Sequence, residues 1–142
     1  MRKSLFLTAF FAGVAMLVMS LCLFSSCSKD DEGESAEIPS GLIGTWRKTS
    51  GADKYDMSFT FKSDGTGTGS INHNRILSYR SYSFKYSYKS SGKVVCDAIC
   101  VSVDENGEDT QSTTLTFTYN GGSTLSGIDT GNTAFAGCTF KK

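Results

Sequence analysis

Residues 55–67 read YDMSFTFKSDGTG, and this stretch decides the fold class. From Tyr55 to Lys62 large apolar side chains alternate with polar ones, which is the period of a strand with one buried face. Ser63-Asp64-Gly65 follows at once, and an Asp-Gly pair between two alternating runs is a strong hairpin signal. The stretch therefore predicts two antiparallel strands joined by a tight turn.

The same unit recurs along the rest of the chain. Alternating runs follow one another at a spacing of about 10–12 residues, and no stretch after Cys27 has the spacing of an amphipathic helix. Because the turns between them are short and carry Gly or Asn, consecutive strands should pair as hairpins. The expected strands are 43–49, 55–62, 67–72, 79–89, 94–103, 112–119, 124–128 and 134–141. We expect an all-β, eight-stranded, antiparallel up-and-down barrel, with a β-sandwich as the alternative.

The N-terminal residues predict export. Arg2 and Lys3 precede an almost wholly apolar run over 5–24, which is long enough to span a bilayer but is followed by the small residues Ser25 and Ser26. Small residues before a cleavage point favour a signal helix that is removed. The expected segments are a signal peptide over 1–26, a flexible acidic linker over 27–40 and a barrel domain over 41–142.

Residues 23–27, LFSSC, resemble the lipobox of bacterial lipoproteins, although Phe24 stands where Leu is most common. The resemblance implies that a lipid on Cys27 anchors the chain to a membrane. The residues that follow are Ser28, Lys29, Asp30, Asp31 and Glu32, and they are similar to the export signal of Bacteroidetes lipoproteins. That similarity implies an outer-membrane location facing the cell exterior, with the periplasmic face as the alternative.

Two motifs of the barrel resemble short lipocalin-like lipoproteins of Bacteroidetes. They are Gly44-Thr45-Trp46 at the first expected strand and FKSDGTG at residues 61–67, which contains Asp64 and Gly65. The resemblance implies that Gly44, Asp64 and Gly65 are structural and that Trp46 closes one end of the barrel. It also implies that Lys141 or Lys142 covers the Trp46 ring.

The inward face of the strand over 79–89 offers the best candidates for ligand contact. A tyrosine has an apolar ring and a polar tip, which suits the wall of a half-wet pocket, but ordinary core packing is the alternative. The candidate ligand-contacting residues are Arg80, Tyr82, Phe84, Tyr86 and Tyr88.

Three cysteines remain after processing. Cys96 and Cys100 lie on one face of a strand about 13 Å apart, which is too far for a disulfide between them. An exported protein meets an oxidising environment, so Cys138 could pair with Cys96 or Cys100. Three small buried side chains are the alternative.

Composition and motifs exclude several classes of function. The 14 basic and 14 acidic residues balance, which argues against a protein that neutralises nucleic-acid phosphates. We find no catalytic motif, no metal site and no cofactor signature. His73 is the only histidine, and no helix follows the glycine-rich residues 65–69 to hold a phosphate.

We therefore expect a lipoprotein that binds a small apolar or amphipathic ligand or serves as an accessory interaction module. A β-sandwich adhesion or glycan-binding domain is the alternative.

Overall fold

The computed structural model describes residues 33–128 and 137–142. The described residues belong to one compact unit, residues 32–142. The expected signal peptide, the expected lipidation site Cys27 and the expected export signal over 28–32 lie outside the described residues. In the described part of the chain, no helix is both long enough and apolar enough to cross a membrane.

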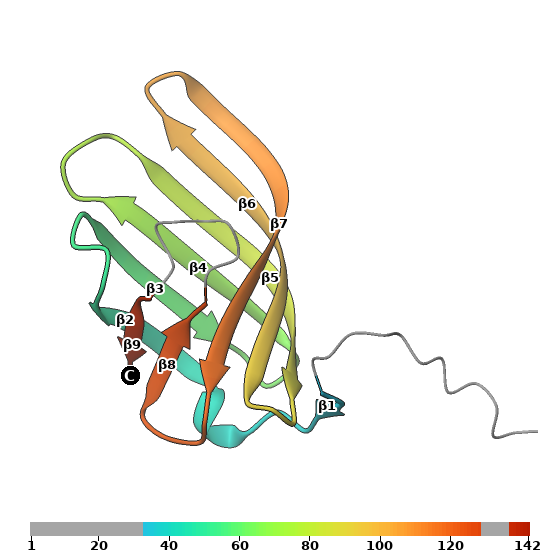
Figure 1. Ribbon diagram of the computed structural model, residues 1–142. Coiled ribbons are helices and arrows are strands. Elements are labelled where there is room, and N and C mark those ends of the chain that lie inside the picture. Colours follow the sequence, from blue (N-terminus) through green and yellow to red (C-terminus); the bar gives the residue numbers. More distant parts are fainter. Residues whose placement is uncertain (1–32, 129–136) are drawn as a thin grey trace, which may run out of the picture. The chain divides into compact units, whose positions relative to one another are not determined.

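The compact unit is a closed antiparallel barrel (Figure 1). Each strand from β2 to β9 pairs with the next, and β9 pairs with β2 to close the ring. The elements are β1 (Ser35–Ala36), η1 (Ser40–Leu42), β2 (Gly44–Ser50), β3 (Tyr55–Phe61), β4 (Thr66–His73), β5 (Tyr79–Lys89), β6 (Lys93–Asp104), β7 (Gly107–Tyr119), β8 (Thr124–Gly127) and β9 (Thr139–Lys141). The expected eight-stranded up-and-down barrel is confirmed, and the sandwich alternative is wrong.

Three boundaries differ from the expected ones by more than one residue. β7 begins at Gly107 and not at residue 112, because its first residues pair with β6 in a hairpin that needs no buried face. β9 covers only Thr139–Lys141 within the described residues, and residues 129–136 lie outside them. The folded unit also begins before residue 41, because β1 pairs with β5 and Ile38 packs against the core.

The β3–β4 turn shows why residues 63–65 form a hairpin. Gly65 has a positive φ of 79°, which a residue with a side chain rarely adopts. The Asp64 carboxylate accepts hydrogen bonds from the Thr66 amide at 2.9 Å and the Thr66 hydroxyl at 2.6 Å. These bonds, with the hydroxyl bond as the largest cause, hold the pKa of Asp64 below its ordinary value. The predicted structural roles of Asp64 and Gly65 follow from this geometry.

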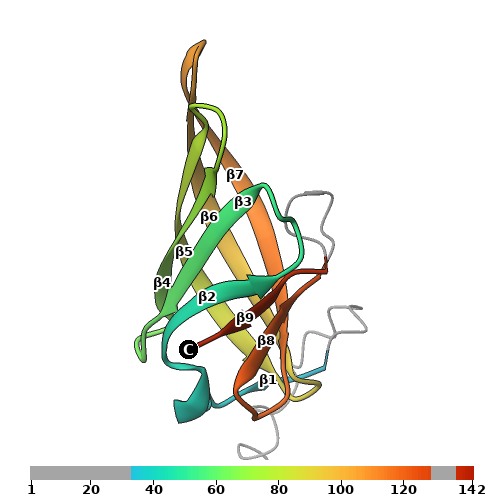
Figure 2. The ribbon, with the colours of Figure 1, turned by 90° about the vertical axis from the view of Figure 1, so that its left-hand side faces the viewer.

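The two ends of the barrel carry different connections (Figures 1 and 2). The closed end, as we name it, holds η1, the turns β3–β4, β5–β6 and β7–β8, and the C-terminal Lys142. The open end holds the connections β2–β3, β4–β5 and β6–β7, and the long β6–β7 hairpin projects beyond its neighbours there (Figure 2). Any difference in chemistry between these ends therefore bears on where a ligand could enter.

Aromatic side chains fill the interior toward the closed end. The Phe59 ring lies 5.0 Å from Phe117 and 5.5 Å from Phe140, measured between centroids. The Phe61 ring contacts Tyr86 at 5.0 Å, also edge to face. Such edge-to-face pairs add stability beyond the apolar area that they bury. The closed half is therefore a packed core and not a lumen.

The glycine-rich residues 65–69 serve this packing. A Cβ added at Gly67 would overlap the Phe84 ring, and one at Gly69 would overlap the Phe59 ring. Both rings thus lie directly on the backbone of β4, where only glycine leaves room. The repeat has a structural explanation that requires no phosphate.

Candidate functional site

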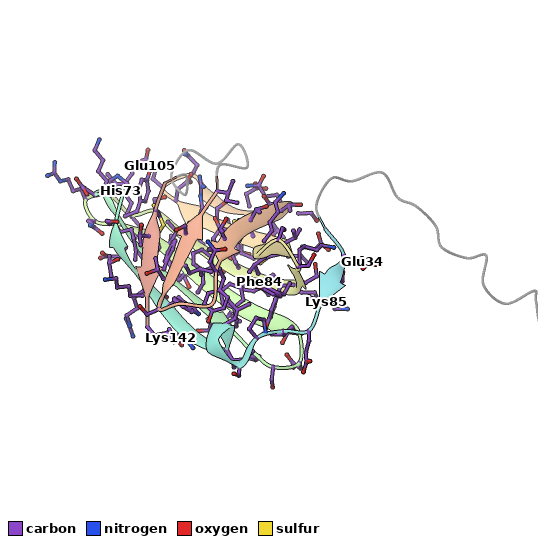
Figure 3. All side chains as sticks on the ribbon, turned by 60° about the horizontal axis from the view of Figure 1, so that its bottom comes forward. Glu34, His73, Phe84, Lys85, Glu105 and Lys142 are labelled. Carbon is purple, nitrogen blue, oxygen red and sulfur yellow. The ribbon has the colours of Figure 1, made fainter. Side chains whose placement is uncertain are left out.

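The candidate residues of β5 divide into core and rim. Tyr82, Phe84 and Tyr86 are buried, whereas Arg80 and Tyr88 are half-buried. Phe84 lies inside the ring of strands, and its neighbour Lys85 lies on the outside (Figure 3). The structure thus places Phe84 and Tyr86 in the packed core, which was the alternative to ligand contact.

The tyrosines of β5 also differ in the hydrogen bonds that their hydroxyl groups form. The Tyr86 hydroxyl donates to the Lys62 carbonyl oxygen at 2.6 Å, and the Tyr88 hydroxyl reaches the Tyr119 carbonyl oxygen at 3.4 Å. The Tyr82 hydroxyl is buried and has no hydrogen-bond partner among the described residues. Tyr82 is therefore the tyrosine of this row with unused hydrogen-bonding capacity.

Trp46 seals the closed end. Its side chain is completely buried, and its indole N–H donates to the Leu42 carbonyl oxygen at 2.8 Å. The Lys142 ammonium lies 5.2 Å from the centroid of the Trp46 ring and donates to the carbonyl oxygens of Gly41 at 2.6 Å and Ile43 at 2.5 Å. Of the two lysines that the resemblance offered, Lys142 covers the ring. Among the described residues, Trp46 and Lys142 thus close the barrel interior at this end.

Gly44 belongs to the same arrangement. Its φ of 129° lies in the region that favours glycine, and a Cβ there would lie 3.2 Å from the Lys142 side chain. The structural role expected for Gly44 is thus to let β2 start beneath Lys142.

The interior changes character toward the open end. Cross-strand partners share a face of the sheet, so the register defines successive rows of inward residues. The row nearest the core is Phe61, Gly67, Phe84, Ala98 and Thr113; the next is Phe59, Gly69, Tyr82, Cys100 and Gln111; the third is Met57, Ile71, Arg80, Ser102 and Asp109. Polar groups thus replace aromatic rings from row to row.

Lys48 is a second inward cation near the open end. It follows Trp46 by two residues on β2, so both share the inward face. Its ammonium donates to the carbonyl oxygens of Gly51 at 2.9 Å and Ala52 at 2.8 Å. Lys48 was not among the predicted site residues, although the alternation from Trp46 places it on the inward face.

Exposed apolar side chains gather in the β4–β5 connection at the open end. Ile76 is 63% exposed and Leu77 is 79% exposed, and Tyr79 at the start of β5 is 42% exposed. Exposed large apolar residues in one segment indicate a contact surface more often than single scattered ones do. We name Ile76, Leu77 and Tyr79 the apolar rim.

Cys96, Cys100 and Cys138 are all buried thiols, and no disulfide joins them in the described part of the chain. Cys96 and Cys100 share one face of β6, as their spacing predicted, and this face points inward, opposite Tyr86 and Tyr82. Burial raises the pKa of the Cys96 and Cys138 thiols, so these two stay protonated near neutral pH. Three small buried side chains, the alternative to a disulfide, describe what the structure contains.

Several surface hollows lie elsewhere on the barrel. One, of about 440 Å³, lies near the closed end and is lined by Glu37, Ile38, Pro39, Ser40, Ile43 and Ser63. Others of about 330 and 310 Å³ lie over β6–β7 and over β2–β4. Within residues 33–128 and 137–142, no cluster of His, Cys, Asp and Glu could hold a metal ion.

No protein-family model, no curated protein and no solved structure matches the chain. The candidate site therefore rests on the chemistry of the barrel itself. It comprises Arg80, Tyr82 and the apolar rim, all at or near the open end.

The buried tyrosines predict a loss of stability at alkaline pH. Burial is the main cause that raises the pKa of Tyr82 and of Tyr86 from 10.0 to about 12. Between these values the folded protein keeps protons that the unfolded chain has lost, so the free energy of unfolding should fall as pH rises. Urea unfolding from pH 9 to 12 measures this slope, and Tyr82→Phe and Tyr86→Phe should each flatten it. A slope that neither variant changes would contradict the prediction.

Proposed function

We propose that this chain is an outer-membrane lipoprotein, anchored through Cys27 and displayed on the cell surface, whose barrel binds a small amphipathic molecule at its open end. The observation that carries the proposal is the contrast between the two ends. Trp46 and Lys142 seal the closed end, whereas the open end combines a buried hydroxyl, a cation and exposed apolar side chains. Ligand sites typically combine an apolar surface with a few placed polar groups.

The point at which the chain joins the barrel supports this assignment. The Ser90 amide donates to the Glu34 carbonyl oxygen at 3.0 Å, and β1 pairs with Tyr88 and Lys89. Arg80 stands nine residues from Lys89 along β5, about 30 Å in an extended strand. The described chain therefore enters the barrel at the closed end, at the opposite end of β5 from Arg80.

An uncharged probe tests the binding function. A chain that begins at Ser28 is suitable, because the ring of strands and the core lie within the compact unit 32–142. We expect 1-decanol to bind this chain in a calorimetric titration, and Leu77→Ser to weaken binding about tenfold because it removes apolar contact area. Ile99→Ser is the matched control, since Ile99 is 51% exposed on the outer face of β6. If both variants lose the same affinity, the apolar rim is not the site.

Lipid labelling tests the anchor. Cys27→Ser should abolish the incorporation of labelled palmitate and leave an uncut precursor, because the cysteine is the proposed attachment point. In the same cells, replacing Asp30, Asp31 and Glu32 with Ala should reduce cleavage by external protease. Labelling of the Cys27→Ser chain would show that the attachment point is wrong, and unchanged cleavage of the acidic-residue variant would remove surface display.

The tyrosines of β5 give no support to a glycan-binding surface. Tyr82 and Tyr86 are buried, so they cannot stack against a sugar on the outside of the barrel. An adhesion domain is therefore not proposed.

A further inference from the structure

We propose that the open end recognises the negative charge of its ligand: the Arg80 guanidinium and the Tyr82 hydroxyl together bind the carboxylate of an amphipathic monoanion. The inference rests on the proposed function and names the class of molecule that it would take. It follows from three properties of the inward rows at the open end.

The first property is a cation that is not neutralised. Arg80 lies in the inward row between Ile71 and Ser102 and is half-buried. Asp109 continues that row on β7, but Arg80 forms no ion pair with it or with any other described residue. A partly buried guanidinium gains most from a carboxylate, which accepts its N–H groups in a fork.

The second property is the unsatisfied hydroxyl. Tyr82 is 3% exposed, and its hydroxyl oxygen has no hydrogen-bond partner among the described residues. Leaving such a group without a partner is costly, and most buried polar groups in folded proteins are hydrogen-bonded. Tyr82 and Arg80 share a strand face two residues apart, which lets one bound oxyanion accept from both.

The environment keeps the Tyr82 hydroxyl protonated and able to donate. Burial is the main cause of its raised pKa, the neighbouring Cys100 thiol adds to it, and only Arg80 opposes it. At neutral pH the pair therefore presents one positive charge and one neutral donor. This combination suits a single negative charge.

The third property is that the other inward cation is already occupied. Both hydrogen bonds of the Lys48 ammonium go to the Gly51 and Ala52 carbonyl oxygens, which hold the β2–β3 connection. Among the cations on inward positions of the described strands near the open end, Arg80 is then the one that remains available. We infer a monocarboxylate and not a doubly charged phosphate.

The same geometry orients the ligand. Tyr82 lies one row deeper than Arg80, and the exposed Ile76 and Leu77 precede Arg80 in the chain. The charged group would therefore enter first, and the apolar part would cover the apolar rim.

Paired probes of equal length test the inference. The chain that begins at Ser28 is titrated at neutral pH with sodium decanoate, 1-decanol and decyl phosphate. We expect decanoate to bind at least about tenfold more tightly than decanol. Hydrogen bonds to a charged group contribute enough free energy for a tenfold ratio of dissociation constants. Arg80→Leu should remove this preference, with a loss of decanoate affinity about tenfold larger than any change in decanol affinity, and Arg80→Lys should restore part of the preference. Tyr82→Phe should weaken decanoate binding several-fold more than it weakens decanol binding.

Matched controls separate this site from general charge effects. Arg75→Leu changes the net charge equally at an exposed position of the same connection and should leave both affinities unchanged. Tyr86→Phe removes a hydroxyl that is already bonded and should also have no effect.

The outcomes separate the inference from the proposed function. Equal binding of decanol and decanoate would overturn the charge recognition and leave the binding function intact. A loss of decanoate affinity with Arg75→Leu as large as that with Arg80→Leu would also overturn the charge recognition. Tighter binding of decyl phosphate than of decanoate would overturn it as well. If neither decanol nor decanoate binds, both the proposed function and the inference are wrong.

Discussion

Replacing Gly67 with alanine should destabilise the barrel by about 3 kcal/mol or more, although it adds only one methyl group. A Cβ at this position would lie 2.5 Å from the Thr60 carbonyl oxygen and would overlap the Phe84 ring. Phe84 could move only within a packed core, and the Thr60 oxygen belongs to the backbone of β3. Both neighbours therefore resist the movement that would relieve the overlap.

The rest of the chain offers a matched control. Gly122 lies in the β7–β8 turn, and a Cβ there would meet nothing within 4 Å. Gly122→Ala should therefore change the free energy of unfolding by no more than about 0.5 kcal/mol, as exposed substitutions usually do. Urea unfolding of the two variants measures the difference. Similar midpoints for both would show that β4 does not carry the Phe84 ring as closely as the structure indicates.

The architecture could be predicted from the sequence because two independent signals agreed. Alternation of apolar and polar residues predicted which side chains of β3 and β5 face inward. Turn residues such as Asp64 and Gly65 predicted where one strand connects to the next. Short connections between all strands leave few topologies other than an up-and-down barrel. The bounds of β5 agree with the expected 79–89 residue for residue.

The prediction was wrong where a strand has no buried face. Residues 108–111 of β7 are all polar and exposed, so they show no alternation, yet the hairpin with β6 makes them a strand. β1 has only two residues, both exposed, and exists because β5 extends past β4 and offers it an edge. Hydrogen bonding to a neighbouring strand decides such strands, and the alternation of apolar and polar residues does not report it.

The sequence predicted only part of the candidate site. Alternation places Arg80, Tyr82 and Tyr86 on one face, but it cannot tell which hydroxyl finds a partner. Whether a hydroxyl finds a partner depends on carbonyl groups that are distant in the sequence. The Lys62 carbonyl oxygen accepts from the Tyr86 hydroxyl, whereas the Tyr82 hydroxyl has no such partner among the described residues. The three-dimensional register was needed to separate core from rim.

The second large effect is expected at Trp46, where Trp46→Ala should cost about 3–5 kcal/mol. The side chain is completely buried, and it contacts Tyr119 with ring centroids 5.8 Å apart. Its removal would leave a void at the closed end, and the Lys142 ammonium would lose the ring beneath it. A domain of this size has only about 5–15 kcal/mol of stability in total. The melting temperature should therefore fall sharply.

Spectroscopy distinguishes a buried plug from an exposed ring. Trp46 is the only tryptophan, so the native fluorescence reports on this site alone and should be blue-shifted and poorly quenched by iodide. Trp46→Phe should cost less than Trp46→Ala, because a smaller ring still fills part of the space. Decanoate should leave the Trp46 emission unchanged, since the proposed ligand site lies at the opposite end of the barrel. A red-shifted, freely quenched Trp46 with an unchanged melting temperature in Trp46→Ala would mean that the closed end is not sealed, and Trp46 would then be the first residue to test as a ligand contact.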